Sequence, residues 1–392
     1  MIPPVVRRLG WVSFLTDVAS EMIYPLLPAF LLTLGGGARF LGLMEGVAES
    51  ISAFVKWWTG ARSDRFRRRK PFVLAGYALA TSARPFLSIV NTPFQVVFVR
   101  TLDRFGKGIR SAPRDALLAS SVPAAQRGVA FGYHRMMDNL GSVVGPLVAF
   151  TLARGLHWPL RWIFAATIIP GLCSVALVAG LREAPHEQAA PTARPAEHAP
   201  LSKAVWRYLA VVAIFTLGSS ADSFLLLRMV DLGLSEVWLP LVWLSLSAAK
   251  AATNMPGGRL SDRVGRRRTL AAAWLVYAIA YAAFPLTRSI GLTWGLLVFY
   301  GAYYGLAEGG EKALLSELAR PDEQGRAFGA LHAVTGIFVL PANVMFGWLY
   351  STKASWAFGV SAACALLAVI SLAALVGPDG SRVTKPAPGT AS

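Results

Sequence analysis

Long apolar runs alternate along the chain with short polar or charged stretches. A helix needs roughly 20 mostly apolar residues to cross the hydrocarbon core of a bilayer. Twelve runs meet this requirement, and we expect each to form one transmembrane helix. The predicted helices cover residues 10–34, 40–60, 71–90, 94–116, 128–153, 159–181, 205–227, 236–257, 269–288, 291–315, 327–350 and 355–376. Pro25 and Pro28 predict a break near the outer end of the first helix.

The composition agrees with an all-α membrane protein and excludes an ordinary water-soluble enzyme. The 392 residues are 55% hydrophobic and 15% charged, whereas soluble domains carry about 25% charged residues. The sequence contains no HExxH, GxSxG or Walker A pattern, and Cys173 and Cys364 both lie in apolar runs. We therefore expect no enzymatic activity, no ATP-driven transport, no disulfide framework, no metal site and no cofactor.

The net charge of +17 is concentrated beside the predicted helices. Its densest clusters, at 62–70 and 258–268, each lie between two apolar runs, which indicates cytoplasmic loops rather than a nucleic-acid surface. This bias places both termini in the cytoplasm, and we expect a multi-pass protein of the cytoplasmic (inner) membrane. Residues 182–204, rich in Pro, Ala and charge, predict a cytoplasmic linker. It would separate a six-helix bundle at 1–181 from a second one at 205–392, which ends in a short cytoplasmic tail.

The two halves of the chain repeat each other. The tripeptide Ser-Asp-Arg occurs at 63–65 and 261–263, and Ala-Phe-Gly occurs at 130–132 and 327–329, with nearly equal offsets. Two parallel six-helix halves are one architecture of secondary transporters, whose substrate site lies between the halves. The repeat therefore predicts two pseudo-symmetric six-helix bundles, twelve transmembrane helices in all.

Residues 60–70 (GARSDRFRRRK) and 258–268 (GRLSDRVGRRR) resemble the loop 2–3 signature of the major facilitator superfamily. The resemblance covers nearly the whole chain and implies a transporter of the prokaryotic, twelve-span type. Arg67 stands where the family has a glycine, whereas the second copy has Gly265, which eases the loop turn. The two Asp-Arg pairs are expected to latch the cytoplasmic ends of neighbouring helices. The gating residues that the resemblance implies are Gly60, Asp64, Arg65, Arg68, Gly258, Asp262, Arg263, Gly265 and Arg266.

Residues 140–146 (LGSVVGP) resemble the span-5 motif of the family's antiporters, which implies export. Gly141, Gly145 and Pro146 join the gating residues on this ground, because small residues let helices approach closely and a proline kinks a span. The alternative is ordinary small-residue packing, since Val and Ala at 148–149 replace the glycines that the family has there.

Asp17 and Glu21 lie four residues apart in the first predicted helix and share one face. Acidic side chains at membrane depth are costly unless they face a cavity or a partner. We interpret this pair as the proton-coupling residues. The alternative is a structural role, in which each acid pairs with a base on a neighbouring helix.

Other ionisable and aromatic residues within the predicted spans are candidates for the wall of a substrate cavity. The family's span-4 arginine motif is loosely met at Arg100 or Arg104. His134, four residues before Asp138, is either a titrating group or a plain hydrogen-bond partner. Eight tryptophans near predicted span ends, Trp243 among them, are interpreted as interfacial anchors. The candidate cavity residues are Glu49, Lys56, Arg100, Asp103, Arg104, Lys107, His134, Asp138, Asp222, Lys250, Tyr300, Tyr304 and Glu308.

These features predict a secondary active transporter that exports a small polar or charged organic solute in exchange for protons. The alternative is a proton-coupled symporter or a facilitative uptake carrier on the same scaffold. The expected partners are the lipid bilayer, the small-molecule substrate and protons, with no nucleic acid, and the expected state is a monomer.

Overall fold

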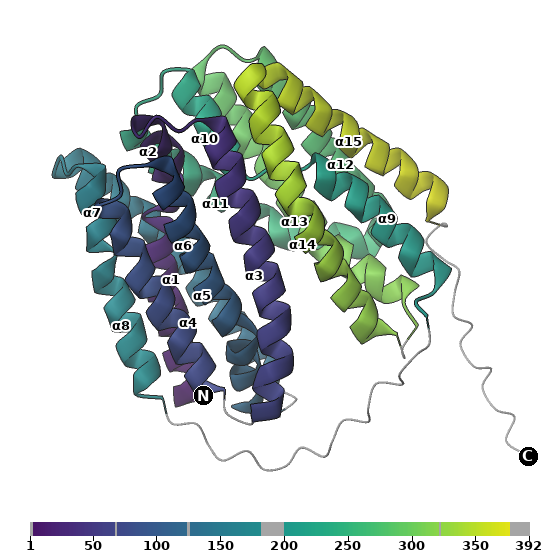
Figure 1. Ribbon diagram of the computed structural model, residues 1–392. Coiled ribbons are helices and arrows are strands. Elements are labelled where there is room, and N and C mark those ends of the chain that lie inside the picture. The colour runs from purple at the N-terminus through teal and green to yellow at the C-terminus, as the bar shows by residue number, and fades with distance from the viewer. Residues whose placement is uncertain (1–2, 67–68, 124–125, 182–199, 321–322, 377–392) are drawn as a thin grey trace, which may run out of the picture.

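The helices of the described residues form twelve consecutive units, as the twelve apolar runs predict, and Figure 1 shows their arrangement. The computed structural model describes residues 3–66, 69–123, 126–181, 200–320 and 323–376, without the side chains of residues 60–66 and 308–309. None of the described residues lies in a strand. The prediction of an all-α fold is therefore confirmed.

Among the described residues the N-terminal half contains six units, four of which are extended or interrupted by a further short helix. These units are α1 (Pro4–Glu21) with η1 (Tyr24–Leu26) and α2 (Leu27–Thr33), α3 (Ala38–Phe66), α4 (Lys70–Ala83) with η2 (Arg84–Ser88), α5 (Pro93–Ser120), α6 (Arg127–Phe150) with the π-helical η4 (Thr151–Gly155), and α7 (Leu160–Ala166) with α8 (Ile168–Ala179).

The C-terminal half contains the other six units. They are α9 (Lys203–Gly218) with α10 (Ser223–Asp231), η5 (Glu236–Trp238) with α11 (Leu239–Val264), α12 (Arg266–Ala283) with η6 (Phe284–Leu286), α13 (Ile290–Leu318), α14 (Gln324–Thr352) and α15 (Ala354–Leu375).

The first unit of each half is broken into two helices. In the first half α1 ends at Glu21 and a 3₁₀ turn leads into α2, because Pro25 and Pro28 lack the amide hydrogens that a continuous helix needs. In the second half α9 ends at Gly218, and Asp222 is the N-cap residue of α10. Only the first break is predicted by the sequence. Each break lies beside acidic residues that line or adjoin the cavity described below.

The two halves use the same helix pairs. In the first half α1 packs against α6 and α8, and α4 and α3 pack against α5; in the second half α9 packs against α14 and α15, and α12 and α11 pack against α13. Between the halves α3 packs against α14, and α6 packs against α11, which are also equivalent pairs. The predicted pseudo-symmetry is thus present in the packing.

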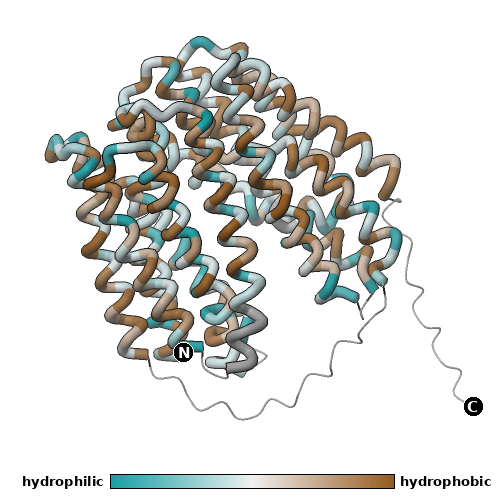
Figure 2. Tube along the Cα trace, in the orientation of Figure 1, coloured by the Kyte–Doolittle hydropathy of each residue, from teal (hydrophilic) through white to brown (hydrophobic). Residues whose placement is uncertain are grey.

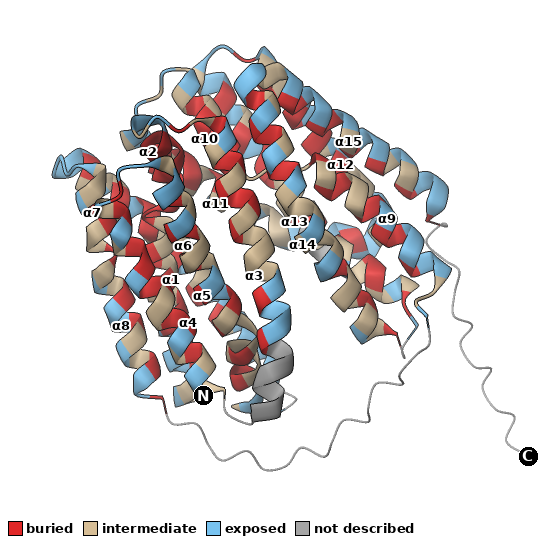
Figure 3. Cartoon of the chain, in the orientation of Figure 1, coloured by how far each residue is buried: buried red, intermediate tan, exposed pale blue. Residues whose placement is uncertain are grey.

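The halves meet near the end that carries α2 and α10, and they diverge towards the end where α1 and α9 begin (Figure 1). Apolar positions follow the lengths of the helices, and polar positions gather in the connecting segments and along some helices (Figure 2). Buried residues concentrate where helices face one another, whereas exposed ones lie on the outside (Figure 3). Large apolar side chains such as Phe98, Ile169 and Ile370 are exposed there, as expected of a surface in contact with lipid.

Within the described residues, eight helical units are long and apolar enough to cross a membrane. The other four contain α3, α4, α5 and α11, and α3, α5 and α11 carry many of the charged candidate residues. α3, α5 and α11 continue beyond the apolar runs, because a helix satisfies its own backbone hydrogen bonds in water as well as in lipid. The second Ser-Asp-Arg tripeptide consequently lies in the last turns of α11, not in a loop as the sequence motif implies.

Candidate functional site

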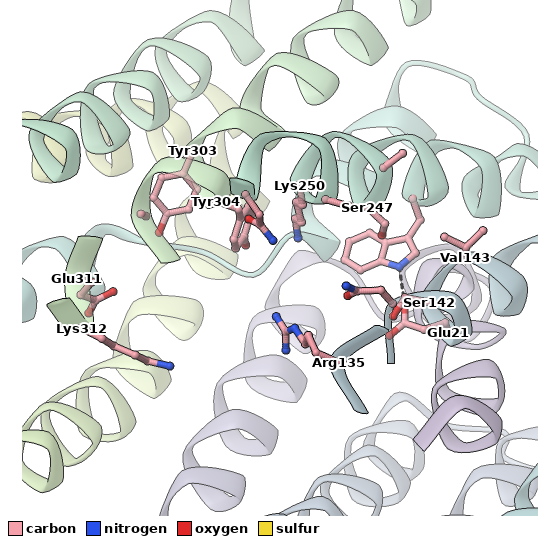
Figure 4. A pocket seen from close by; sticks show the side chains of 16 residues that line it. Glu21, Arg135, Ser142, Val143, Ser247, Lys250, Tyr303, Tyr304, Glu311 and Lys312 are labelled. Atoms are coloured by element: carbon pink, nitrogen blue, oxygen red, sulfur yellow. Dashed lines mark hydrogen bonds between the residues drawn. The ribbon is translucent and has the colours of Figure 1, made fainter. Parts of the chain in front are cut away.

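Two adjoining compartments lie on the inner faces of the helices. The central compartment, of about 500 Å³, is lined by α1, α6, α11 and α13 and lies between the two halves (Figure 4). The basic compartment, of about 360 Å³, lies within the N-terminal half among α1, α3, α4, α5 and α6. Glu21, Arg135, Asn139 and Ser142 line both, so the two compartments are continuous along one wall.

Charged side chains dominate the basic compartment. Seven basic and five acidic residues line it, so its wall has an excess of positive charge. These residues are Lys56, Arg84, Arg104, Lys107, Arg110, Arg114 and Arg135, and Asp17, Glu21, Asp103, Asp115 and Asp138.

Asp103 on α5 is held by two arginines. Its Oδ1 lies 2.8 Å from Nε of Arg84, and its Oδ2 lies 3.3 Å from Nη1 of Arg100. Arg84 also donates from Nη1 to the carbonyl of Thr16, and Arg100 lies over the ring of Tyr24 at 5.1 Å. All three ionised side chains are almost fully buried, a situation that proteins tolerate only when the charges are paired.

The next residues along α5 pair with α3 and α4. Nε of Arg104 lies 3.3 Å from Oε1 of Glu49. The guanidinium of Arg110 lies over the ring of Tyr77 at 4.5 Å, and Arg110 is only 4% exposed. The charged candidate residues of α5 therefore face the interior of the N-terminal half.

Asp17 and Glu21 both line the basic compartment, and the glycines of the span-5 motif pack directly against them. A Cβ atom on Gly141 would lie 2.8 Å from Cβ of Asp17, and one on Gly145 would lie 2.8 Å from Cβ of Glu21. Contacts this short exclude any larger residue without a shift of α6 away from α1. The glycines therefore allow α6 to cover the two acids closely.

Asp138 on α6 lines the same compartment opposite α1. It accepts a hydrogen bond from Ser13, and Nδ1 of His134 lies 3.5 Å from its Oδ2. His134 itself is buried and does not line either compartment.

Asp222 is the buried acid of the C-terminal half. It lies 2.7 Å from Nζ of Lys250 and accepts hydrogen bonds from the hydroxyls of Tyr300 and Tyr304, at 2.9 Å and 2.9–3.0 Å. The ammonium group of Lys250 also lies 3.7 Å from the centre of the Tyr304 ring. Lys250 and Tyr304 line the central compartment (Figure 4). Asp222 and Tyr300 do not line it but contact these two residues.

A direct bond joins the two halves across the central compartment. The indole N–H of Trp243 donates to Oε2 of Glu21 at 2.6 Å, the dashed line at Glu21 in Figure 4. The ring of Trp243 also packs against that of Tyr24, with 4.6 Å between centroids. Seven of the eight tryptophans interpreted as anchors are exposed, but Trp243 is 8% exposed and lines the cavity. The anchor interpretation is wrong for Trp243, because this residue, although near the start of α11, is buried and bonds to Glu21 instead of facing lipid.

The structure groups the candidate cavity residues in two shells. Those on the compartment walls are Lys56, Asp103, Arg104, Lys107, Asp138, Lys250 and Tyr304. Each candidate behind the walls contacts one of these: they are Glu49, Arg100, His134, Asp222 and Tyr300. Glu308 lies outside the residues whose side chains are described.

Of the gating residues of the first copy, Gly60, Asp64 and Arg65 lie in the last turns of α3 with their side chains undescribed, and Arg68 lies outside the described residues. In the second copy Gly265 adopts a φ of +101° between α11 and α12, a conformation that favours glycine. Arg266 binds the carbonyl of Ala313 and pairs with Glu317 on α13 at 3.0 Å. Gly258, Asp262 and Arg263 lie towards the end of α11, and Pro146 lies within α6. Their roles in gating stay predictions.

Sequence reasoning missed Arg84, Arg110, Arg135 and Trp243 as cavity residues. A signal existed for Arg84, the only charged residue of the predicted span 71–90. The described residues contain no group of three or more His, Cys, Asp or Glu side chains that could hold a metal ion.

Comparison with known proteins places this geometry in a family. The model described as Major Facilitator Superfamily matches residues 9–306 and 229–392. The chain is 30% identical over 376 residues to an uncharacterised MFS-type transporter of Methanocaldococcus jannaschii, with 94% of each chain covered. It is 27% identical to the multi-drug resistance efflux pump PmrA of Streptococcus pneumoniae, covering 79% of this chain and 80% of that one. A bacterial homologue of the lysosomal transporter Spinster, inward-facing and unoccupied, superposes with a TM-score of 0.74 at 15% identity, with 96% of each chain covered.

Proposed function

Because the chain belongs to the major facilitator superfamily, we propose that it is a proton-coupled secondary transporter of a small charged organic solute. The family assignment makes it a membrane transporter rather than an enzyme, and the relatives from an archaeon and a bacterium agree with the prokaryotic type. The observation that carries the proposal is the pair Asp17 and Glu21 on the wall of a charged cavity. Such acids suit a proton carrier, since a proton on either changes the charge that the solute meets.

Transport in this proposal proceeds by alternating access. Residues 1–181 and 205–392 act as two rocking units, joined by the linker at 182–204, around the central compartment. The charge bias of the loops supports an inner-membrane orientation with both termini in the cytoplasm. In that orientation the halves diverge towards the cytoplasm (Figure 1). The chain works as a monomer, because each half supplies one wall of the same cavity.

Export by proton antiport is the first candidate for the direction of coupling. The packing of Gly141 and Gly145 on Asp17 and Glu21 supports it, because it links the antiporter-like motif physically to the acids. The similarity to PmrA, which is described as an efflux pump, also favours export.

Proton symport is the second candidate. The excess of basic side chains around Asp17 favours it, since protonation of Asp17 increases that excess and would attract an anionic solute. The two candidates predict opposite proton movements.

Both candidates are tested in liposomes that contain the purified protein and an internal pH dye. Solute pools are added outside without a proton gradient. Symport acidifies the lumen and antiport makes it alkaline, and either response should disappear in Asp17→Asn but persist in Glu236→Gln, an exposed control. Solute flux without any proton movement would overturn proton coupling.

A further inference from the structure

We propose that the solute is an organic anion whose carboxylate binds Arg110 and Lys107 in the basic compartment, while its apolar body lies against Trp243 and Tyr304 in the central compartment. This inference rests on the proposed transport function and names its substrate class. It comes from three features: a buried guanidinium without an acceptor, the way the other charges are paired, and the aromatic wall next to them.

Arg110 is the first feature. It is 4% exposed and lines the basic compartment, and among the described residues its buried Nη1 has no hydrogen-bond partner. The Tyr77 ring covers one face of the guanidinium but supplies no acceptor to Nη1. A buried N–H of a charged group is costly to leave unpaired. A carboxylate is the usual partner of a guanidinium, because its two oxygens match the donor geometry.

The pairing of four other arginines in this region is the second feature. Asp103 binds Arg84 and Arg100, and the other two pairs are Arg104 with Glu49 and Arg114 with Asp115. Each of these cations already has a carboxylate at 2.8–3.3 Å. Arg110 and Lys107 are different, since both face Asp17 of α1 across the compartment. An added anion can therefore pair with Arg110 and Lys107 without displacing one of these ion pairs.

The aromatic wall is the third feature. The central compartment carries the rings of Trp243, Tyr303 and Tyr304. Its lysine, Lys250, is already neutralised by Asp222 at 2.7 Å and lies over the Tyr304 ring. Because Lys250 is already paired, this wall offers aromatic contact area to the apolar body of the solute rather than a partner for the carboxylate of the solute. Because the compartments are continuous at Arg135 and Ser142, one molecule can occupy both.

The position of Asp17 also sets the direction of coupling. The charged groups that act on it are Glu21 on its own helix, Lys107 and Arg110 on α5, and Asp138 on α6; α8, which also packs on α1, contains no acidic or basic residue. An ionised Asp17 competes with the solute carboxylate for Lys107 and Arg110, and a proton removes this competition. The anion and the proton consequently favour each other's binding. Of the two candidates above, antiport and symport, an anionic solute therefore favours symport.

The test measures ligand-induced thermal stabilisation of the purified full-length protein with four probes. These are 1-naphthoate, its neutral isostere 1-naphthamide, the cation 1-naphthylmethylammonium, and acetate. We expect 1-naphthoate to bind, the amide to bind about tenfold to a hundredfold more weakly because it lacks the charge-assisted hydrogen bonds, and the cation not to bind. Acetate should also bind weakly, since it lacks the apolar body.

Three variants show where the carboxylate binds. Arg110→Gln should weaken 1-naphthoate binding at least about tenfold, Arg110→Lys should weaken it less, and Arg154→Gln, an exposed control on η4, should leave it unchanged. Binding to the unaltered protein should tighten as the pH falls, and Asp17→Asn should bind tightly with no such dependence. The pH profile keeps the inference testable if Arg110→Gln fails to fold.

Failure of 1-naphthoate to bind, or equal binding of the amide or the cation, overturns the anion assignment. Looser binding at low pH overturns the coupling that it implies. The proposed function fails separately, when no solute of any charge moves protons in the liposome assay.

Discussion

Trp243 on α11 and Glu21 on α1 are joined by a hydrogen bond of 2.6 Å, so the wall of the central compartment is itself a contact between the two halves. The Tyr24 ring, 4.6 Å from that of Trp243, extends the same contact. Any change at Glu21, a proton included, therefore acts both on the charge of the cavity and on the attraction between the halves.

Trp243→Phe should shift the equilibrium between the open and closed arrangements of the halves. Phenylalanine keeps the ring packing with Tyr24 but removes the N–H, and a hydrogen bond to a charged acceptor contributes about 1.5–3 kcal/mol. We expect a population shift of about tenfold to a hundredfold away from the arrangement described here.

Spin labels at Arg7 and Arg207, exposed near the starts of α1 and α9, would report this shift as a shorter distance. Trp348→Phe, which changes an exposed tryptophan, is the matched control. An unchanged distance distribution in Trp243→Phe would show that the bond does not bias the two states.

Gly145→Ala should impair transport by pushing α6 away from α1. The added methyl group would lie 2.7 Å from the carbonyl oxygen of Val18 and 2.8 Å from Cβ of Glu21. Overpacking of this kind costs about 1–3 kcal/mol, and the displacement falls on the acid pair itself. Transport rate and thermal stability should both fall, whereas Gly132→Ala on the same helix, where nothing lies within 4 Å, should retain both. Equal behaviour of the two variants would contradict the packing argument.

Arg84→Gln should destabilise the N-terminal half. Asp103 would keep Arg100 but lose its shorter ion pair, at 2.8 Å, in a site where both partners are almost fully buried. Breaking one partner of a buried pair costs about 3–5 kcal/mol, and we expect the lower end because Arg100 remains. Unfolding midpoints in an SDS titration measure this, with Arg288→Gln, an exposed residue, as control. A loss no larger than that of the control would mean that Arg100 alone satisfies Asp103.

Glu323, between α13 and α14, should make the free energy of unfolding depend on pH in the acidic range. Burial of its carboxylate disfavours ionisation, but the backbone N–H groups of Arg320 and Ser202 and the Arg320 guanidinium all donate to it. The net effect lowers the pKa of Glu323 from 4.5 to about 2. Its contribution is therefore complete above pH 4.5 and is lost as the pH falls towards 2.

Glu323→Gln should remove that part of the acid dependence and lower stability at neutral pH. Thermal unfolding followed across this pH range tests the assignment, and Glu236→Gln, at an exposed position, serves as the reference. A pH profile identical to that of the unaltered protein would exclude Glu323 as the titrating group.

The helices were predictable because a segment in lipid must form all its backbone hydrogen bonds internally. The break after Glu21 was predictable from Pro25 and Pro28. The break before Asp222 carries no proline and could not be anticipated from the local sequence. Where the second break falls depends on how α9 and α10 pack against neighbouring helices, and the local sequence of this unit does not specify that packing.

The candidate site was predictable only in part, for a similar reason. Helical spacing shows which residues of one helix share a face, so Lys107 was predictable on the same face as Arg100 and either Asp103 or Arg104. Which neighbours meet that face is set by the rotation and tilt of other helices. Arg84 and Trp243 line the compartments because of this rotation and tilt, which the sequences of their own spans do not show.

The central claim is that Asp17 couples proton movement to solute movement. It is tested most directly by proton flux into liposomes that contain the unaltered protein or Asp17→Asn, with the same solute added outside. The account predicts solute-dependent proton flux in the first and none in the second, while both proteins insert and still bind solute. Undiminished proton flux in Asp17→Asn would contradict it.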